Sequence, residues 1–153
     1  MSRILFLVLL FMGLINAGVV SAELPPRSVP IIYVTDLYHP HDDPDDHFDL
    51  ATLFGLSAFD IKAIIIDTGT RGMERPGICA IQQMMHVTGN TEIPYATGLK
   101  DNRKSQADKA DQQPQEVQGG VNLILKVLRE SEKPVTLFAT GSLRDVAAAY
   151  NRE

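Results

Sequence analysis

The sequence has little of what marks the specialised protein classes. Cys79 is the only cysteine among 153 residues, so a framework of disulfide bonds within the chain is excluded. Tryptophan is absent. The 14 basic residues are outnumbered by 19 acidic ones and form no long Lys/Arg block, which argues against nucleic acid as the partner. An apolar fraction of 44% excludes wholesale disorder, and the length fits one globular domain.

Residues 1–22 have the pattern of a secretory signal peptide. An apolar run from residue 4 to residue 20 follows a basic residue, and small side chains lead up to Ala22. We predict cleavage after Ala22 and a mature chain, residues 23–153, that is secreted or periplasmic and keeps no stable membrane anchor. The alternative is a transmembrane anchor, but 17 apolar residues interrupted by Asn16 are at the lower limit for crossing a bilayer.

Strand and helix patterns alternate along the mature chain. Short β-branched runs predict strands, and apolar residues at helical spacing predict helices. The predicted strands are residues 28–34, 61–66, 93–96 and 135–139, and the predicted helices begin near Pro44, Pro76, Val121 and Leu143. This alternation predicts an α/β fold with a mostly parallel, Rossmann-like sheet, right-handed crossovers and helices on both faces.

Two other segments carry narrower predictions. Residues 98–118 are rich in Lys, Asp, Gln and Ser with hardly any apolar residue, so we expect a long solvated loop. Cys79 falls in a predicted apolar helix, where a cysteine is more often inert core than a redox centre.

Polar residues follow three of the predicted strands. In parallel sheets, ligands collect at the carboxyl ends of the strands. The candidate site therefore comprises the residues that follow these strands, namely Asp36 onward, Asp67-Thr68 and Thr140-Gly141.

Residues 35–49 carry six aspartates and three of the four histidines. Carboxylates this dense raise one another's pKa unless something neutralises them, and a hard cation with oxygen ligands does so, Ca²⁺ before Mg²⁺ in a secreted protein. The alternatives are a solvated acidic loop and aspartates that serve as helix caps. Because Asp36 ends a strand and Asp45-Asp46 opens the next helix, we favour metal binding.

The histidines of this cluster are weaker candidates for metal binding. His39 and His41 have no cysteine or further histidine nearby at a zinc-binding spacing. We expect both to line the cleft, with His39 in contact with substrate.

Several segments occur in the order of the motifs of one enzyme family. They are Ile31–Asp36 with Pro44–Ala51, then Lys62–Ile66, Gly89–Tyr95 and Phe138–Ala147. The first two resemble the Asp-x-Asp-x-x-x-Asp-Asp signature of inosine-uridine preferring nucleoside hydrolases, and the last resembles that family's Thr-Gly-Pro-Leu-Thr-Asn-type turn. The resemblance implies calcium-dependent hydrolysis of the N-glycosidic bond of ribonucleosides, with a small-molecule riboside as the substrate.

The resemblance also implies a role for particular residues. Asp36 would be the general base and a calcium ligand, Asp46 and the backbone carbonyl of Thr140 would be further calcium ligands, and Asp45 would hold ribose hydroxyls. Thr70 stands near the position where the family usually has an asparagine that contacts ribose.

The chain departs from the family pattern in three ways. Val34 replaces the first Asp of the motif, and the loop after Asp36 is longer than the family's. The pair Asp42-Asp43 therefore competes with Asp45-Asp46, which we choose because an apolar helix follows it. The family's domain is also longer, and its remaining calcium ligand, an Asp preceded by a His, has no counterpart here. We accordingly expect residues 23–153 to be the N-terminal part of such a domain, and its activity on its own is left open.

Two other functions compete with the hydrolase. A secreted, non-catalytic metal- or sugar-binding module could use the same carboxylates. A metal-dependent phosphoesterase could also use strand-end aspartates, although no Gly-rich loop that would hold a phosphate supports it. The preferred base and the oligomeric state, including a homo-oligomer, are not fixed by the sequence.

Overall fold

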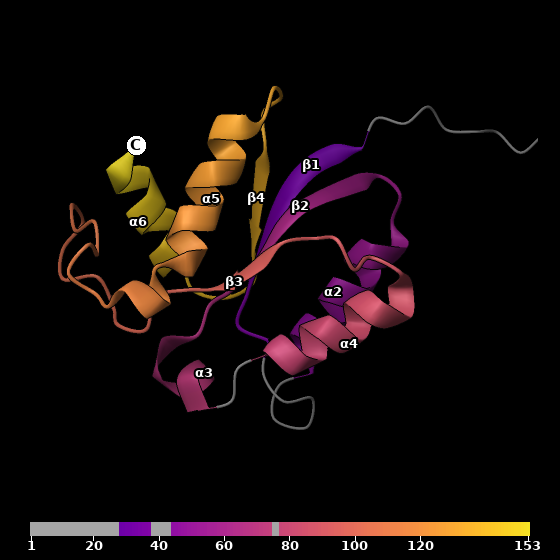
Figure 1. Ribbon diagram of the computed structural model, residues 1–153, viewed down its shortest axis with the longest axis horizontal. Coiled ribbons are helices and arrows are strands. Elements are labelled where there is room, and N and C mark those ends of the chain that lie inside the picture. Colours follow the sequence, from indigo (N-terminus) through magenta and orange to yellow (C-terminus); the bar gives the residue numbers. More distant parts are fainter. Residues whose placement is uncertain (1–27, 38–43, 75–76) are drawn as a thin grey trace, which may run out of the picture.

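The computed structural model describes residues 28–37, 44–74 and 77–153 (Figure 1). The predicted signal peptide and the residues His39, His41, Asp42 and Asp43 lie outside the described residues. Among the described helices, none has the length and apolar character needed to cross a membrane.

The described strands form one parallel sheet, as the alternating pattern predicted. They are β1 (Val29–Thr35), β2 (Phe59–Ile66), β3 (Tyr95–Thr97) and β4 (Thr136–Ala139), in the order β3-β2-β1-β4. Both β2 and β4 pair with β1 in parallel, and β3 pairs with β2 in the same sense. The strand order reverses between β1 and β4, and such a switch point is where open α/β sheets bind ligands, at the carboxyl ends of the strands.

Helices cover both faces of this sheet, which confirms the predicted fold class. Figure 1 shows α2 (Asp45–Gly55) and α4 (Ile78–Thr88) on one side, with α5 (Gly119–Glu130) and α6 (Arg144–Arg152) on the other. The short helix α3 (Gly69–Glu74), which was not predicted, follows β2 at the lower edge of the view, and a 3-10 helix, η1 (Gln115–Val117), precedes α5.

Alternate residues of β1 enter two separate hydrophobic cores. Ile31 and Tyr33 pack against α2 and α4, where Leu50 is fully buried. Ile32 and Val34 pack on the opposite side, against α5 and α6. Because a strand covered on both faces has no solvent side, its sequence is a continuous apolar run rather than an alternating one.

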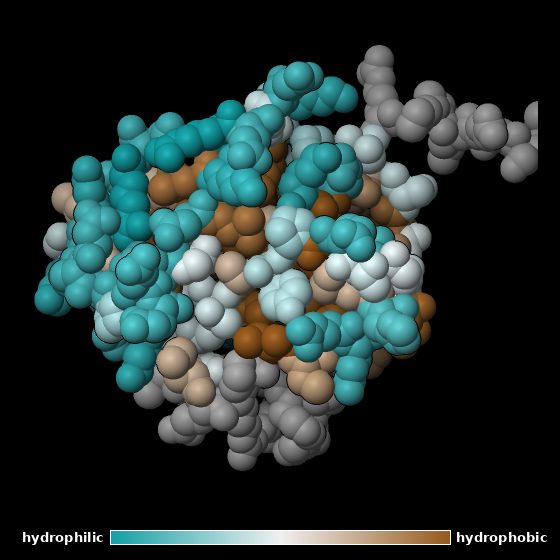
Figure 2. Space-filling model, in the orientation of Figure 1, coloured by the Kyte–Doolittle hydropathy of each residue, from teal (hydrophilic) through white to brown (hydrophobic). Residues whose placement is uncertain are grey.

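The boundaries of the predicted elements are close to those observed, but the prediction of a solvated loop over residues 98–118 was wrong in part. Leu99 and Ala110 are fully buried there. The side-chain amide of Gln118 donates hydrogen bonds to the carbonyls of Ala110 and Gln113, at 2.8 and 3.0 Å. These amide groups satisfy buried backbone, so a polar composition concealed an ordered segment. Hydrophilic residues still cover its outer surface at the left of Figure 2.

The prediction for Cys79 was also wrong. Ile81 and Met85 are buried against the sheet, whereas Cys79 lies on the exposed side of α4. Two positions along a helix correspond to about half a turn, so a residue two before a buried one lies on the opposite side.

Candidate functional site

Asp36 and Asp46 meet at the carboxyl end of β1. Asp36 directly follows the strand, and Asp46 lies in the first turn of α2 with only 3% of its surface exposed. The backbone N–H of Asp36 donates a hydrogen bond of 3.1 Å to Oδ2 of Asp46, and the hydroxyl of Thr35 donates to the same oxygen. The carboxyl of Asp46 is also close enough to the carboxyl of Asp36 to raise its pKa, so the structure brings the two predicted carboxylate ligands together.

Asp36 has an unusual pKa. Burial raises it from 3.8 to about 6, and the nearby carboxyls of Asp46 and Asp67 act in the same direction. A carboxylate in this setting is destabilised in its charged form, which a neighbouring cation would relieve.

The turn after β4 passes beside this pair. A Cβ atom at Gly141 would lie only 2.9 Å from the backbone nitrogen of Asp36 and 3.2 Å from Oδ2 of Asp67, so a larger residue would not fit without a shift. The N–H of Thr140 donates to the carbonyl of Val34 at 2.9 Å. The predicted third ligand, the carbonyl of Thr140, thus belongs to a residue bonded to the end of β1.

A third carboxylate at this edge is paired with an arginine. Asp67 follows β2 and is 2% exposed, and Arg144 lies at the start of α6. The guanidinium donates to Oδ1 of Asp67 from Nη2 at 2.5 Å and from Nε at 3.1 Å, while the N–H of Ser142 donates to Oδ2 at 2.7 Å. The sequence placed Asp67 at this edge, but it did not reveal the partner, which is 77 residues away.

Asp145 is a fourth carboxyl close to this edge, and it is completely buried. Its two oxygens accept the N–H of Leu99 at 3.1 and 3.2 Å. Burial raises its pKa to about 7, and the Leu99 hydrogen bond and the charge of Arg144 oppose that shift. Its donor and its burial indicate a role in holding the 98–118 segment against α6.

The remaining predicted residues are less closely defined. Asp45 is exposed in the first turn of α2, where its Oδ1 accepts the N–H of Asp46 at 2.9 Å. Thr70 is the second residue of α3, and His39 lies outside the described residues. Next to Asp46, both ring nitrogens of His47 are buried without a hydrogen-bond partner within the described part of the chain.

The donor set at this edge fits a hard cation. Carboxylate and carbonyl oxygens are the ligands that Ca²⁺ prefers. Among the described residues, no three His, Cys, Asp or Glu side chains are grouped so as to hold a metal. The predicted set has only two such side chains, Asp36 and Asp46. Its third ligand is a backbone carbonyl, that of Thr140, so the set is not a group of three ligand side chains.

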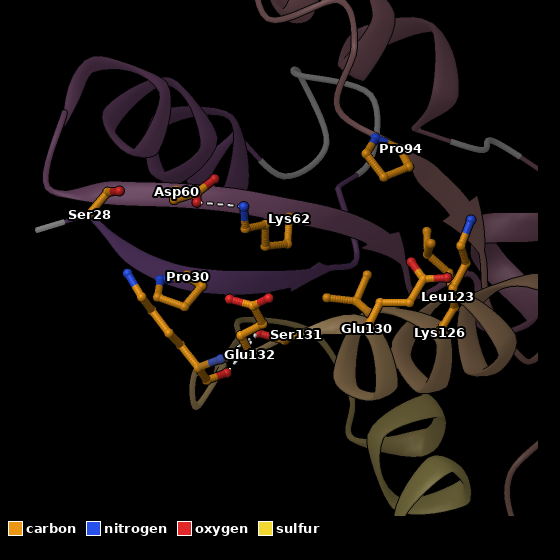
Figure 3. Close-up of a pocket in the computed structure, with 12 residues that line it drawn as sticks. Ser28, Pro30, Asp60, Lys62, Pro94, Leu123, Lys126, Glu130, Ser131 and Glu132 are labelled. Carbon is orange, nitrogen blue, oxygen red and sulfur yellow. Dashed lines mark hydrogen bonds and ion pairs between the residues drawn. The ribbon is translucent and has the colours of Figure 1, made fainter. Parts of the chain in front are cut away.

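A pocket of about 430 Å³ lies at the opposite edge of the sheet (Figure 3). Its walls come from the amino ends of β1 and β2, the last turns of α5 and the loop before β4. Asp60 and Lys62 pair across 2.6 Å at its wall, as the dashed line in Figure 3 marks. Ligands of parallel sheets bind at the carboxyl ends, so volume alone does not make this pocket the candidate site.

Comparisons with protein-family models, with curated proteins and with solved structures found no match to this chain.

Proposed function

We propose that this chain is a calcium-dependent hydrolase of the N-glycosidic bond of ribonucleosides, similar to inosine-uridine preferring nucleoside hydrolases. The observation that carries the proposal is the contact between Asp36 and Asp46 at the carboxyl end of β1, beside the switch point. The predicted signal peptide, residues 1–22, would place this activity outside the cytoplasm.

The calcium ion would be held by the carboxylates of Asp36 and Asp46 and by the backbone carbonyl of Thr140. When bound, it supplies positive charge that makes a nearby water more acidic and coordination positions for two vicinal hydroxyls. Asp45 would hold ribose hydroxyls from the first turn of α2, and Thr70 and His39 remain predicted substrate contacts.

Asp36 would act as the general base. Its carboxylate takes a proton from the attacking water, whose oxygen then bonds to the anomeric carbon of ribose. The bond from that carbon to the nitrogen of the nucleobase breaks, and its electron pair leaves with the nucleobase. Because the sugar gains positive charge in the transition state, a neighbouring carboxylate such as that of Asp46 would stabilise it.

The proposal is tested by incubating the purified protein with inosine and with p-nitrophenyl riboside, once with Ca²⁺ and once with a chelator. We expect sugar release with Ca²⁺ and none with the chelator. Calcium uptake without sugar release would favour the non-catalytic binding module instead. Hydrolysis of p-nitrophenyl phosphate but not of the ribosides would favour the phosphoesterase.

A further inference from the structure

Two hydroxyl groups, those of Tyr33 and Thr140, are linked by hydrogen bonding next to the candidate site. Tyr33 is fully buried on the α2 side of β1, and its hydroxyl lies 3.1 Å from Oγ1 of Thr140. Oγ1 of Thr140 in turn lies 3.4 Å from the carbonyl of Val34, to which it donates. Since that carbonyl has no proton, the arrangement favours Tyr33 as the donor to Thr140.

Burying the tyrosine hydroxyl at this position is energetically unfavourable unless it has a hydrogen-bond partner. Burial of a hydroxyl without a partner is destabilising, whereas an aliphatic side chain would fill a core position at no such cost. The ring of Tyr33 stacks on Phe138 with centroids 5.7 Å apart, so its direction is fixed and its hydroxyl points to the end of β4.

Thr35, two residues further along β1, also lies close to the Tyr33 hydroxyl and contacts another predicted calcium ligand. Its hydroxyl donates to Oδ2 of Asp46 and accepts the N–H of Leu37 at 3.1 Å. Tyr33 and Thr35 lie on the same side of the strand, because alternate residues of a strand share a face. Side chains on one face of β1 therefore contact two residues that are predicted to hold calcium. Tyr33 contacts Thr140, and Thr35 contacts Asp46.

We infer that Tyr33 is a positioning residue for the calcium site, which it serves by fixing Thr140 at the end of β4 through its hydroxyl. This inference rests on the proposed calcium site. Groups that bond to metal ligands orient them, and their loss typically weakens metal affinity by about 10–100-fold. Tyr33 does not touch the metal, so its effect is expected at the lower end of that range.

The test is a calorimetric titration of Ca²⁺ into the wild type and into Tyr33→Phe, which removes only the hydroxyl. We expect the variant to bind Ca²⁺ about tenfold more weakly, with little change in the melting temperature of the metal-free protein. Tyr95→Phe is the matched control, because Tyr95 is a half-buried residue of β3 whose hydroxyl accepts an exposed hydrogen bond of 2.6 Å from Gln82. That control should bind Ca²⁺ as the wild type does.

Substitutions of Thr140 give a second, independent test should Tyr33→Phe fail to fold. Thr140→Val removes the hydroxyl at constant shape and should weaken Ca²⁺ binding, whereas Thr140→Ser retains Oγ and should preserve it. If the wild type binds Ca²⁺ and Tyr33→Phe or Thr140→Val binds equally well, the positioning role is overturned and the proposed function stands. If the wild type takes up no Ca²⁺, the proposed function fails and the positioning role with it.

Discussion

Arg144 holds the buried carboxylate of Asp67 with two nitrogen donors on a single oxygen, Nη2 at 2.5 Å and Nε at 3.1 Å. The side chains are 18% and 2% exposed, so both charges are largely removed from water. Loss of one partner of a buried pair leaves the other uncompensated, at a cost of about 3–5 kcal/mol. We therefore expect Arg144→Ala to lower the free energy of unfolding by about 3 kcal/mol in a urea titration.

Arg129 offers a matched control for this prediction. Its guanidinium contacts Glu153 with similar geometry, Nη2 at 2.7 Å and Nε at 3.2 Å, but the side chains are 58% and 59% exposed. Exposed ion pairs contribute at most about 1 kcal/mol, so Arg129→Ala should change stability by less than that. Equal losses in the two variants would contradict the prediction, because burial would then have no influence.

Asp145 gives a prediction about pH. Burial raises its pKa from 3.8 to about 7, so the folded protein retains a proton that the unfolded chain has already released. From about pH 4 to about pH 7 the folded state binds more protons than the unfolded state, and stability through this group must fall as pH rises. We expect Asp145 to lower the free energy of unfolding by a few kcal/mol across this window.

Asp145→Asn isolates this contribution, since an amide oxygen can still accept the N–H of Leu99 but has no charge to bury. Urea titrations of both proteins at several pH values should give a flatter profile for the variant. The difference in stability should grow in favour of asparagine as pH rises. Profiles that stay parallel from about pH 4 to about pH 7 would show that Asp145 is not the group responsible.

Gly98 faces the same carboxyl and cannot accept a side chain. A Cβ atom there would lie 2.2 Å from Oδ2 of Asp145, whose carboxyl is completely buried and accepts the N–H of Leu99. We expect Gly98→Ala to lower the free energy of unfolding by about 2–3 kcal/mol, because overpacking forces neighbouring atoms to shift.

The control is Gly55→Ala at the end of α2, where no heavy atom lies within 4 Å of the added Cβ. That variant should be neutral or gain up to about 1 kcal/mol, since alanine loses less conformational entropy on folding. Thermal unfolding of the two variants beside the wild type gives the comparison, and a stable Gly98→Ala protein would mean that the carboxyl moves freely.

The parallel sheet was predictable because each of its strands is a local apolar run and each crossover is a local helix pattern. The same locality placed Asp36, Asp67 and Thr140 at one edge, since strand ends can be read from the sequence. The pairs that organise this edge were not predictable. Asp67 with Arg144 and Asp145 with Leu99 join residues 77 and 46 positions apart, and no local pattern encodes such contacts.

The last prediction concerns the chemistry of Asp36. Asp36→Asn keeps the shape of the side chain but removes the base, and general base catalysis typically contributes about 10²–10⁴-fold to the rate. We expect sugar release from inosine in the presence of Ca²⁺ to fall by about that factor. The melting temperature should be unchanged or higher, because burial and neighbouring carboxyls already disfavour the charge of Asp36, as its raised pKa indicates.

The control is Asp60→Asn, the same change at the amino end of β2, where Asp60 pairs with Lys62. Full activity in Asp36→Asn, with Asp60→Asn also active, would show that Asp36 is not the general base, even if the protein still binds Ca²⁺.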